Sequence, residues 1–195
     1  MTPLVSFKDH LDRFRGEYDT KKGIRDGGEV GLIIAIVGEV INRGLVVSNG
    51  TVYLKSENSI RHLEGSCIAA SFVTMVAKKT LDLGSQAMES KDPPVRIFAP
   101  YGLTLIADVV LIGNLEFIPP LPAVVSIVCQ RLGFVRRKEQ ARHPQLEWLT
   151  RGLVNRAKIE EKVVVTSEAS DSSEEEEAPA AASGGGSSSA RTDSS

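Results

Sequence analysis

The sequence predicts a mainly β fold: an antiparallel β-sandwich or jelly-roll-like core with N- and C-terminal amphipathic helices and a disordered acidic tail. Aromatic residues make up only 5% of the 195 residues, so Val, Ile and Leu must form the core, and β-branched side chains suit a pleated sheet. About seven or eight short apolar runs occupy residues 30–135, with turn signals about every ten residues. No helical stretch separates these runs, which favours a sandwich over an α/β sheet, and we find no internal repeat.

These patterns divide the chain into four segments. They are an N-terminal helix and linker (1–29), a β-sandwich core (30–138), a C-terminal helix with a basic region (139–166) and a Ser/Glu-rich tail (167–195). The tail cannot bury enough apolar surface to offset the entropy lost on ordering, so we expect it to be disordered.

Both predicted helices carry apolar residues at three- to four-residue spacing. In residues 4–18 the stripe is Leu4, Phe7, Leu11, Phe14 and Tyr18. Packing on the sheet is favoured over binding a partner or a membrane surface, because the polar face of this helix carries both signs of charge. In residues 143–158 the stripe is Leu146, Leu149, Leu153, Val154 and Ala157.

The strand candidates begin at Val30. Val30–Ile41 is almost uniformly apolar, which predicts a strand buried on both faces. Asn49-Gly50 separates Gly44–Val47 from Thr51–Lys55 and predicts a hairpin, because Asn and Gly tolerate positive φ. The remaining candidates are Ser66–Lys78, Val95–Phe98, Leu103–Ala107, Val109–Leu115 and Val124–Leu132.

The charge distribution is asymmetric. The net charge is −2, but residues 167–195 hold seven acids and one base, which leaves 22 bases and 18 acids in the body. A mildly basic body with an acidic tail suits an anionic partner or screening of the body by its own tail. A tail that only keeps an ordinary domain soluble explains the asymmetry equally well.

Catalytic, metal-binding and targeting signals are not found. Cys67 and Cys129 lie in apolar runs and are read as free thiols, and with three scattered histidines they give no metal-ligand spacing. No nucleophile motif or phosphate-binding glycine loop occurs. We therefore expect a non-enzymatic protein without a cofactor. The chain shows no signal peptide or bilayer-length apolar run, which predicts a soluble or peripherally bound protein.

A basic cluster follows the last strand candidate and continues along the predicted C-terminal helix. Its members are Arg131, Arg136, Arg137, Lys138, Arg142, Arg151 and Arg156. Such cations release counterions when they meet phosphates, so we predict sequence-independent binding of single-stranded nucleic acid. A solvated face balanced by neighbouring glutamates is the alternative. In the tail, Ser172 and Ser173 precede Glu174–Glu177, the pattern that an acid-directed host serine kinase favours.

One stretch carries a family resemblance. The order Phe98, Pro100-Tyr101, Leu103-Thr104 and Asp108, then VVLIGNLEF, PPLPAVVSIVCQRLGF and three basic residues, resembles the second half of the core of plant-virus cell-to-cell movement proteins of the 30-kilodalton superfamily. The resemblance covers about residues 30–138. It makes Asp108 the candidate for the core aspartate of that family, with Asp82 as the other choice.

The resemblance implies a jelly-roll-like fold and a non-catalytic protein. Such a protein binds single-stranded nucleic acid, self-associates, and carries a viral genome through plasmodesmata from the host cytoplasm as a peripheral membrane protein. A small coat or matrix-type structural protein that assembles through sheet edges is the alternative function. A host or microbial β-sandwich adaptor is the third. The mixed charge of residues 1–29 favours transport over genome packaging.

Overall fold

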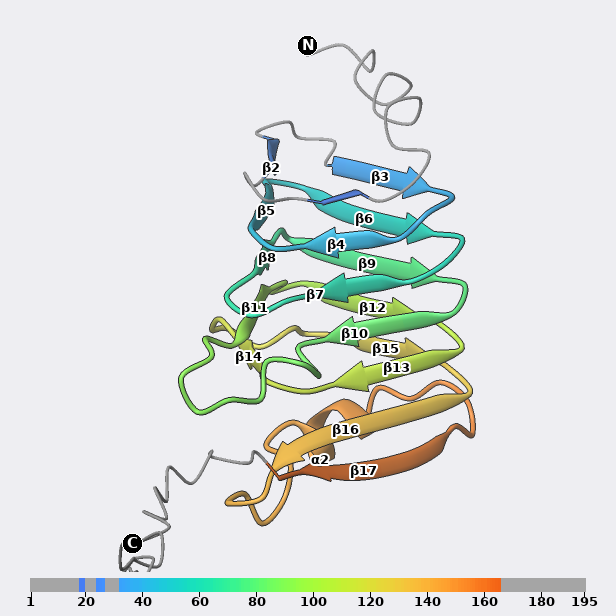
Figure 1. Ribbon diagram of the computed structural model, residues 1–195. Helices are drawn as coiled ribbons and strands as arrows, with labels where there is room; N and C mark the ends of the chain where they lie inside the picture. The colour runs from blue at the N-terminus through green and yellow to red at the C-terminus, as the bar shows by residue number, and fades with distance from the viewer. Residues whose placement is uncertain (1–17, 20–23, 27–31, 166–195) are drawn as a thin grey trace, which may run out of the picture.

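The computed structural model describes residues 18–19, 24–26 and 32–165, with side chains from residue 37 onward. The chain winds as a parallel β-solenoid in which three sheets, A, B and C, run along the stack of coils (Figure 1). From β1 to β15 each coil contributes one strand to each sheet in turn, so β4, β5 and β6 form one coil and β7, β8 and β9 form the next. Every strand pair is parallel.

The elements divide among the sheets as follows. Sheet A contains β1 (Tyr18–Asp19), β4 (Val40–Asn42), β7 (Ile60–His62), β10 (Thr80–Leu83), β13 (Val109–Ile112), β16 (Arg131–Arg137) and β17 (Lys158–Val164). Sheet B contains β2 (Ile24–Asp26), β5 (Leu45–Ser48), β8 (Cys67–Ala69), β11 (Val95–Phe98) and β14 (Leu115–Phe117). Sheet C contains β3 (Leu32–Ile36), β6 (Thr51–Ser56), β9 (Phe72–Ala77), β12 (Gly102–Ile106) and β15 (Val125–Val128). One short helix, α2 (Leu146–Thr150), lies in the last coil.

The core consists of aliphatic columns that run down the inside of each sheet. In sheet C the in-register residues Leu54, Met75, Leu105 and Ile127 stack from coil to coil, and each is at most 1% exposed. Alternation in a strand places every second side chain inside, so one inward residue per coil continues each column. Burying one such side chain contributes about 1.5–3 kcal/mol to folding.

Two glycines allow neighbouring coils to meet at the corner between sheets A and B. Gly84 has φ +78°, a conformation that side chains rarely adopt. A Cβ atom on Gly113 would lie 2.2 Å from the carbonyl oxygen of Gly84. The longest excursion of the described coils, residues 85–94, leaves the stack directly after this contact. The two glycines therefore allow the backbones of two neighbouring coils to lie in contact next to the excursion at residues 85–94.

The predicted antiparallel sandwich is wrong. Short strands with alternating burial and turns about every ten residues occur in both architectures. In this chain each strand bonds to the strand one coil later, as when Val40 pairs with Ile60 and Leu81 with Val110. The coils differ in length and carry different residues, so this periodic structure leaves no sequence repeat.

The predicted hairpin at Asn49-Gly50 is also wrong, because these residues turn the corner between β5 in sheet B and β6 in sheet C. Val30–Ile41 is not one strand either. Its described part forms β3 and β4 in different sheets, separated by a corner at Val37, which is 73% exposed. Corner residues and hairpin residues both need tight turns, so turn chemistry does not separate the two folds.

The predicted helices are corrected as well. Of residues 143–158 only the five residues of α2 are helical, and Lys158 already belongs to β17. Leu146, Leu149, Leu153 and Ala157 of the expected apolar stripe belong to the core or pack against it, but Val154 is 66% exposed. Leu153 forms a parallel bridge with Ile127 of sheet C instead of a helical turn. Tyr18, the last residue of the predicted N-terminal helix, lies in strand β1, and residues 4–17 lie outside the described residues.

Candidate interaction surfaces on the C-terminal coil

The segment between β16 and β17 covers the C-terminal ends of sheets B and C. The N–H of Ile127 donates to the carbonyl of Gly152 at 2.7 Å, and the N–H of Val154 donates to the carbonyl of Ile127 at 2.9 Å. The Asn155 amide group donates to the carbonyl of Cys129 at 2.6 Å. These hydrogen bonds pair backbone N–H and C=O groups at the edge of β15, which would otherwise be exposed without partners.

Apolar contacts hold the same segment against the core. Leu149 of α2 is fully buried, and Trp148 meets Phe117 of β14 edge to face at 4.7 Å between ring centroids. The Gln145 side-chain amide donates to the carbonyl of Leu115 at 3.4 Å. The short helix therefore acts as a lid over the ends of sheets B and C.

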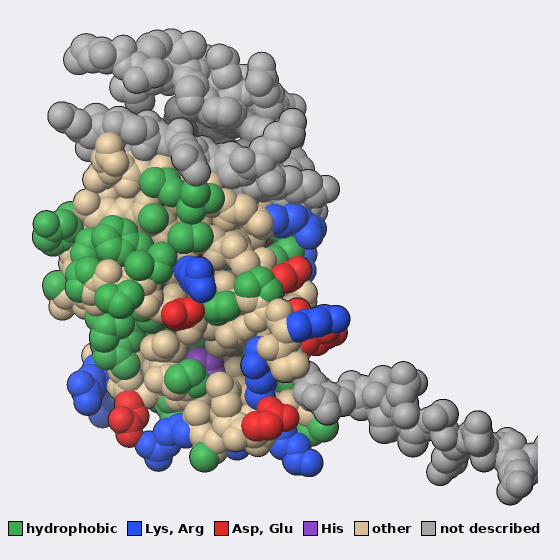
Figure 2. Space-filling view, turned by 90° about the vertical axis from the view of Figure 1, so that its left-hand side faces the viewer, with side chains coloured by type: hydrophobic (Ala, Val, Ile, Leu, Met, Phe, Trp, Pro, Cys, Tyr) green, Lys and Arg blue, Asp and Glu red, His purple; other side chains and the backbone are tan. Residues whose placement is uncertain are grey.

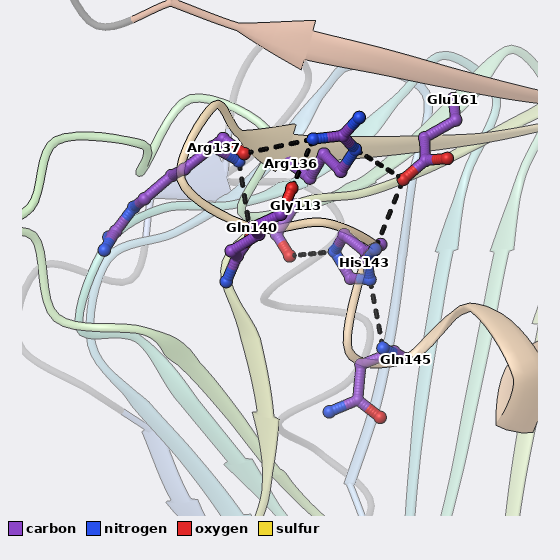
Figure 3. A network of polar contacts seen from close by, with 7 residues as sticks. All are labelled: Gly113, Arg136, Arg137, Gln140, His143, Gln145 and Glu161. Carbon is purple, nitrogen blue, oxygen red and sulfur yellow. Dashed lines mark hydrogen bonds and ion pairs between the residues drawn. The ribbon is translucent and has the colours of Figure 1, made fainter.

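His143 fixes the entry to this lid (Figure 3). Its Nε2 lies 2.8 Å from the carbonyl of Gly113, and its Nδ1 lies 3.1 Å from the backbone N–H of Gln145. A carbonyl only accepts and an N–H only donates, so the proton is on Nε2 and the ring is neutral. Burial lowers the pKa of His143, which agrees with this neutral tautomer.

Arg136 is bound within the same network. Its Nε lies 2.8 Å from a carboxylate oxygen of Glu161 on β17, and its guanidinium also donates to the carbonyl of Gln140. The same Glu161 oxygen accepts from the backbone N–H of His143 at 3.2 Å. Figure 3 shows these groups converging from β16, β17 and the loop between them. Arg136 therefore ties the last two strands to the lid.

Two more of the predicted nucleic-acid-binding residues have partners in the fold. Arg137 donates to the backbone carbonyl of Glu89 at 2.8 Å, and Arg142 pairs with Glu147 at 2.7 Å. Arg137 thereby joins the end of β16 to the excursion at residues 85–94. Arg142 and Glu147 are both well exposed, so this pair contributes little to stability.

The other four, Arg131, Lys138, Arg151 and Arg156, are exposed to solvent. Arg131 and Lys138 stand at opposite ends of β16, about 20 Å apart at the usual rise of a strand. Basic side chains are therefore distributed around the last coil, and Figure 2 shows them interleaved with acidic ones at that end of the molecule. The structure does not gather the seven residues into one patch.

A smaller basic group lies where β16 and β17 begin. Arg131 is the register partner of Lys158, and Arg156 precedes Lys158 by two residues. Lys158 pairs with Glu160 at 2.7 Å, and it lowers the pKa of Glu160, with a smaller contribution from Arg131. Adjacent cations on neighbouring strands repel each other unless an anion lies between them.

Asp108 lies at the corner between β12 and β13, where its side chain is exposed. Its backbone carbonyl accepts from the N–H groups of Gln130 and Arg131, at 2.9 and 3.1 Å. Asp82 is buried and accepts two hydrogen bonds from Ser85, and burial raises its pKa. The Asp82 carboxylate thus holds the residues that follow β10, whereas Asp108 contributes its backbone carbonyl at a corner. Ser172 and Ser173 lie outside the described residues.

The free edge of β17 is the feature that the sequence prediction missed. β17 is the last strand of sheet A, and no described residue pairs with its outer edge. The N–H of Lys158 bonds to Gln130, so alternate residues from Lys158 onward face β16, and the backbone groups of Ile159, Glu161 and Val163 face outward. Ile159 and Val163 are also 47% and 39% exposed. The β-branched residues in KIEEKVV were the available signal.

A second apolar area lies at the start of sheet C. Phe72 and Tyr101 stack at 5.7 Å between ring centroids, and Val124 and Leu121 are 61% and 53% exposed. Figure 2 shows hydrophobic side chains gathered along one margin of its face. Nothing in the structure indicates what covers this area.

No group of metal-binding side chains is found among the described residues. They include no cluster of three or more His, Cys, Asp or Glu that could hold a metal ion. Cys67 and Cys129 are free, and burial raises the pKa of both thiols, which disfavours the reactive thiolate. Within the same part of the chain, no helix has the length and apolarity needed to cross a membrane.

Comparisons with known proteins give no relative for this fold and these surfaces. A scan against protein-family models, a search of curated proteins and a search of solved structures each found no match to this chain.

Proposed function

We propose that this protein is a non-enzymatic structural protein, a rod of parallel coils that self-associates through its C-terminal end. The observation that carries this proposal is the outward edge of β17, where sheet A stops without a partner among the described residues. At the same end the lid bonds to the edge of β15 in sheet C and packs against β14 of sheet B, whereas no described residue covers the edge of sheet A.

An exposed strand edge is a template for pairing with another strand. On β17 the edge comprises the N–H and C=O groups of three residues, Ile159, Glu161 and Val163, and two of these side chains are apolar and partly exposed. Seven consecutive residues pair β17 with β16, so the edge is held in an extended conformation before any partner arrives. Such preorganisation lowers the entropic cost of association.

Sedimentation equilibrium of the full chain over a range of concentrations tests this proposal. We expect the mean mass to rise with concentration. Val163→Pro removes an outward N–H but no bond to β16, so it should shift the association to higher concentration. Val163→Thr keeps the N–H and serves as the matched control. A wild-type chain that remains monomeric throughout contradicts the proposal.

Binding of single-stranded nucleic acid is a second candidate function, favoured by the exposed group of Arg131, Arg156 and Lys158. Arg131→Ala with Arg156→Ala should weaken binding to a labelled oligonucleotide and flatten the dependence of log K on log salt by roughly 0.7 per lost contact. Lys55→Ala with Arg96→Ala removes the same charge from other sheets and is the control. Equal effects of the two double variants contradict this candidate.

Transport of a viral genome between cells stays a prediction that rests on the family resemblance. A fluorescent fusion that marks puncta across leaf cell walls would support it. A uniform distribution would contradict it.

A further inference from the structure

We infer that the partner of β17 is β17 of a second copy of this chain, paired antiparallel about a two-fold axis at Glu161. This inference rests on the proposed function and adds the partner strand, its direction and its register. A two-fold contact uses the same surface on both copies and closes the assembly as a dimer. The backbone and the side chains of β17 both favour this arrangement.

The backbone limits the registers. Ile159, Glu161 and Val163 point their N–H and C=O groups outward, so only registers that place these residues opposite one another form hydrogen bonds. With Ile159 opposite Val163 of the second copy, Glu161 lies opposite its own counterpart. All three residues of each strand then form hydrogen-bonded pairs, and every outward backbone group is satisfied.

The side chains select this register from the others that the backbone allows. In this register the Ile159 side chain of each copy lies opposite Val163 of the other copy, which gives two apolar pairs on one face of the sheet. On the other face the same register places Glu160 against Lys162 twice, at non-hydrogen-bonded positions, where opposed side chains approach most closely. Two apolar pairs and two opposite-charge pairs result.

Neighbouring registers oppose like charges. A shift by two residues in one direction places Glu160 opposite Glu160 and Lys158 opposite Lys162. The shift in the other direction places Lys162 opposite Lys162 and Glu161 opposite Val163. Like charges directly opposed destabilise a strand pair.

The inferred register has one like-charge contact, between the two copies of Glu161. Each of these carboxylates is already paired with Arg136 of its own chain at 2.8 Å, which offsets their repulsion. Inward-pointing charges and edge lysines also occur on strands that are kept free of partners. The competing explanation is therefore that Glu161 and the lysines prevent another strand from pairing with β17. Charge reversal distinguishes this explanation from pairing between two copies.

Charge reversal at the opposed pair tests the register. Glu160→Lys sets two lysines against each other at this pair, and Lys162→Glu sets two glutamates against each other. We expect each variant alone to raise the dimer dissociation constant at least about tenfold, because two pairs change from attraction to repulsion in each dimer. An equimolar mixture restores two opposite-charge pairs and should form a mixed dimer, seen by native mass spectrometry, with about the wild-type affinity.

Two controls accompany the mixture. Lys55→Glu makes the same charge change as Lys162→Glu, but on the outer face of sheet C. It should leave the dissociation constant of the dimer within about twofold of the wild-type value. Thermal unfolding of each variant shows that the monomer is folded, which matters because Glu160 also pairs with Lys158. Lys162→Glu breaks no ion pair found in the described structure.

The outcomes separate the inference from the proposed function. If the wild-type chain dimerises and Val163→Pro weakens the dimer, but the mixture forms no mixed dimer, the register is overturned and the proposed function stands. If the wild-type chain stays monomeric, both are overturned and the charges of β17 protect a free edge. Preferential formation of the mixed dimer supports the inference.

Discussion

The buried histidine of sheet A makes the stability of the solenoid depend on pH. His62 is 1% exposed in the core, where its Nδ1 lies 3.1 Å from the side-chain amide of Asn42 and its Nε2 lies 3.0 Å from the sulfur of Met75. None of these neighbours is a carboxylate that would stabilise an imidazolium ion. Burial lowers the pKa of His62 from 6.5 to about 3.

The direction of the effect follows from proton binding. Above pH 6.5 the ring is neutral in both the folded and the unfolded chain, so His62 contributes no pH dependence. Below pH 6.5 the unfolded chain takes up a proton that the folded chain excludes, and stability falls until about pH 3. Each pH unit in this window costs about 1.4 kcal/mol, so lowering the pH to about 4.5 costs about 2.7 kcal/mol.

Urea unfolding of the wild-type chain and of His62→Gln, each at pH 7.0 and 4.5, measures this contribution. Glutamine does not titrate and can accept a hydrogen bond from Asn42. His143, whose pKa burial also lowers, and the carboxylates titrate in both chains, so their effects cancel in the comparison. The wild-type chain should lose about 2.7 kcal/mol more than the variant between the two pH values. Equal losses would refute a neutral, desolvated His62.

Core packing and coil contact give two further predictions, both checked by urea unfolding. Leu105→Ala should lower the free energy of unfolding by about 2–5 kcal/mol, because it opens a cavity in the column of buried side chains inside sheet C. Ile106→Ala, on the outer face of β12, should cost less than about 1 kcal/mol. Similar losses in the two variants would contradict the assignment of inner and outer faces. Gly113→Ala should cost about 3 kcal/mol, because its Cβ would overlap the backbone of Gly84. In Gly102→Ala the Cβ would lie 3.1 Å from the exposed ring of Phe72 and 3.8 Å from the carbonyl oxygen of Val124, so this variant should cost under about 1 kcal/mol. A neutral Gly113→Ala would contradict the close approach of the two coils.

Much of the strand content was predictable because it depends on local pattern. Val95–Phe98 was predicted with the bounds of β11, and Val109–Leu115 contains all of β13. The parallel architecture was not predictable in the same way. Whether Val110 pairs with the next strand in the chain or with Leu132, one coil later, depends on contacts between residues far apart in sequence. Burial alternates in the same way in both cases.

For the surfaces of the last coil, too, the residue types were predictable from the sequence but their contacts were not. The cations were visible in the sequence, but the ion pair between Arg136 and Glu161 exists only because β16 and β17 lie side by side. The sequence therefore overestimated the number of cations available to a ligand. It also suggested a helix up to residue 158, where strand β17 begins instead. The β-branched Ile159, Val163 and Val164 favour this strand, and no described residue pairs with its outer edge.

Amide hydrogen exchange of the full chain, resolved by residue and measured at low and high protein concentration, tests directly whether the chain associates through β17. The amides of Glu160, Lys162 and Val164 point toward β16 and should be protected at both concentrations. The amides of Ile159, Glu161 and Val163 should exchange rapidly in dilute solution and become protected as the concentration rises. Rapid exchange of these three amides at every concentration would contradict association through β17.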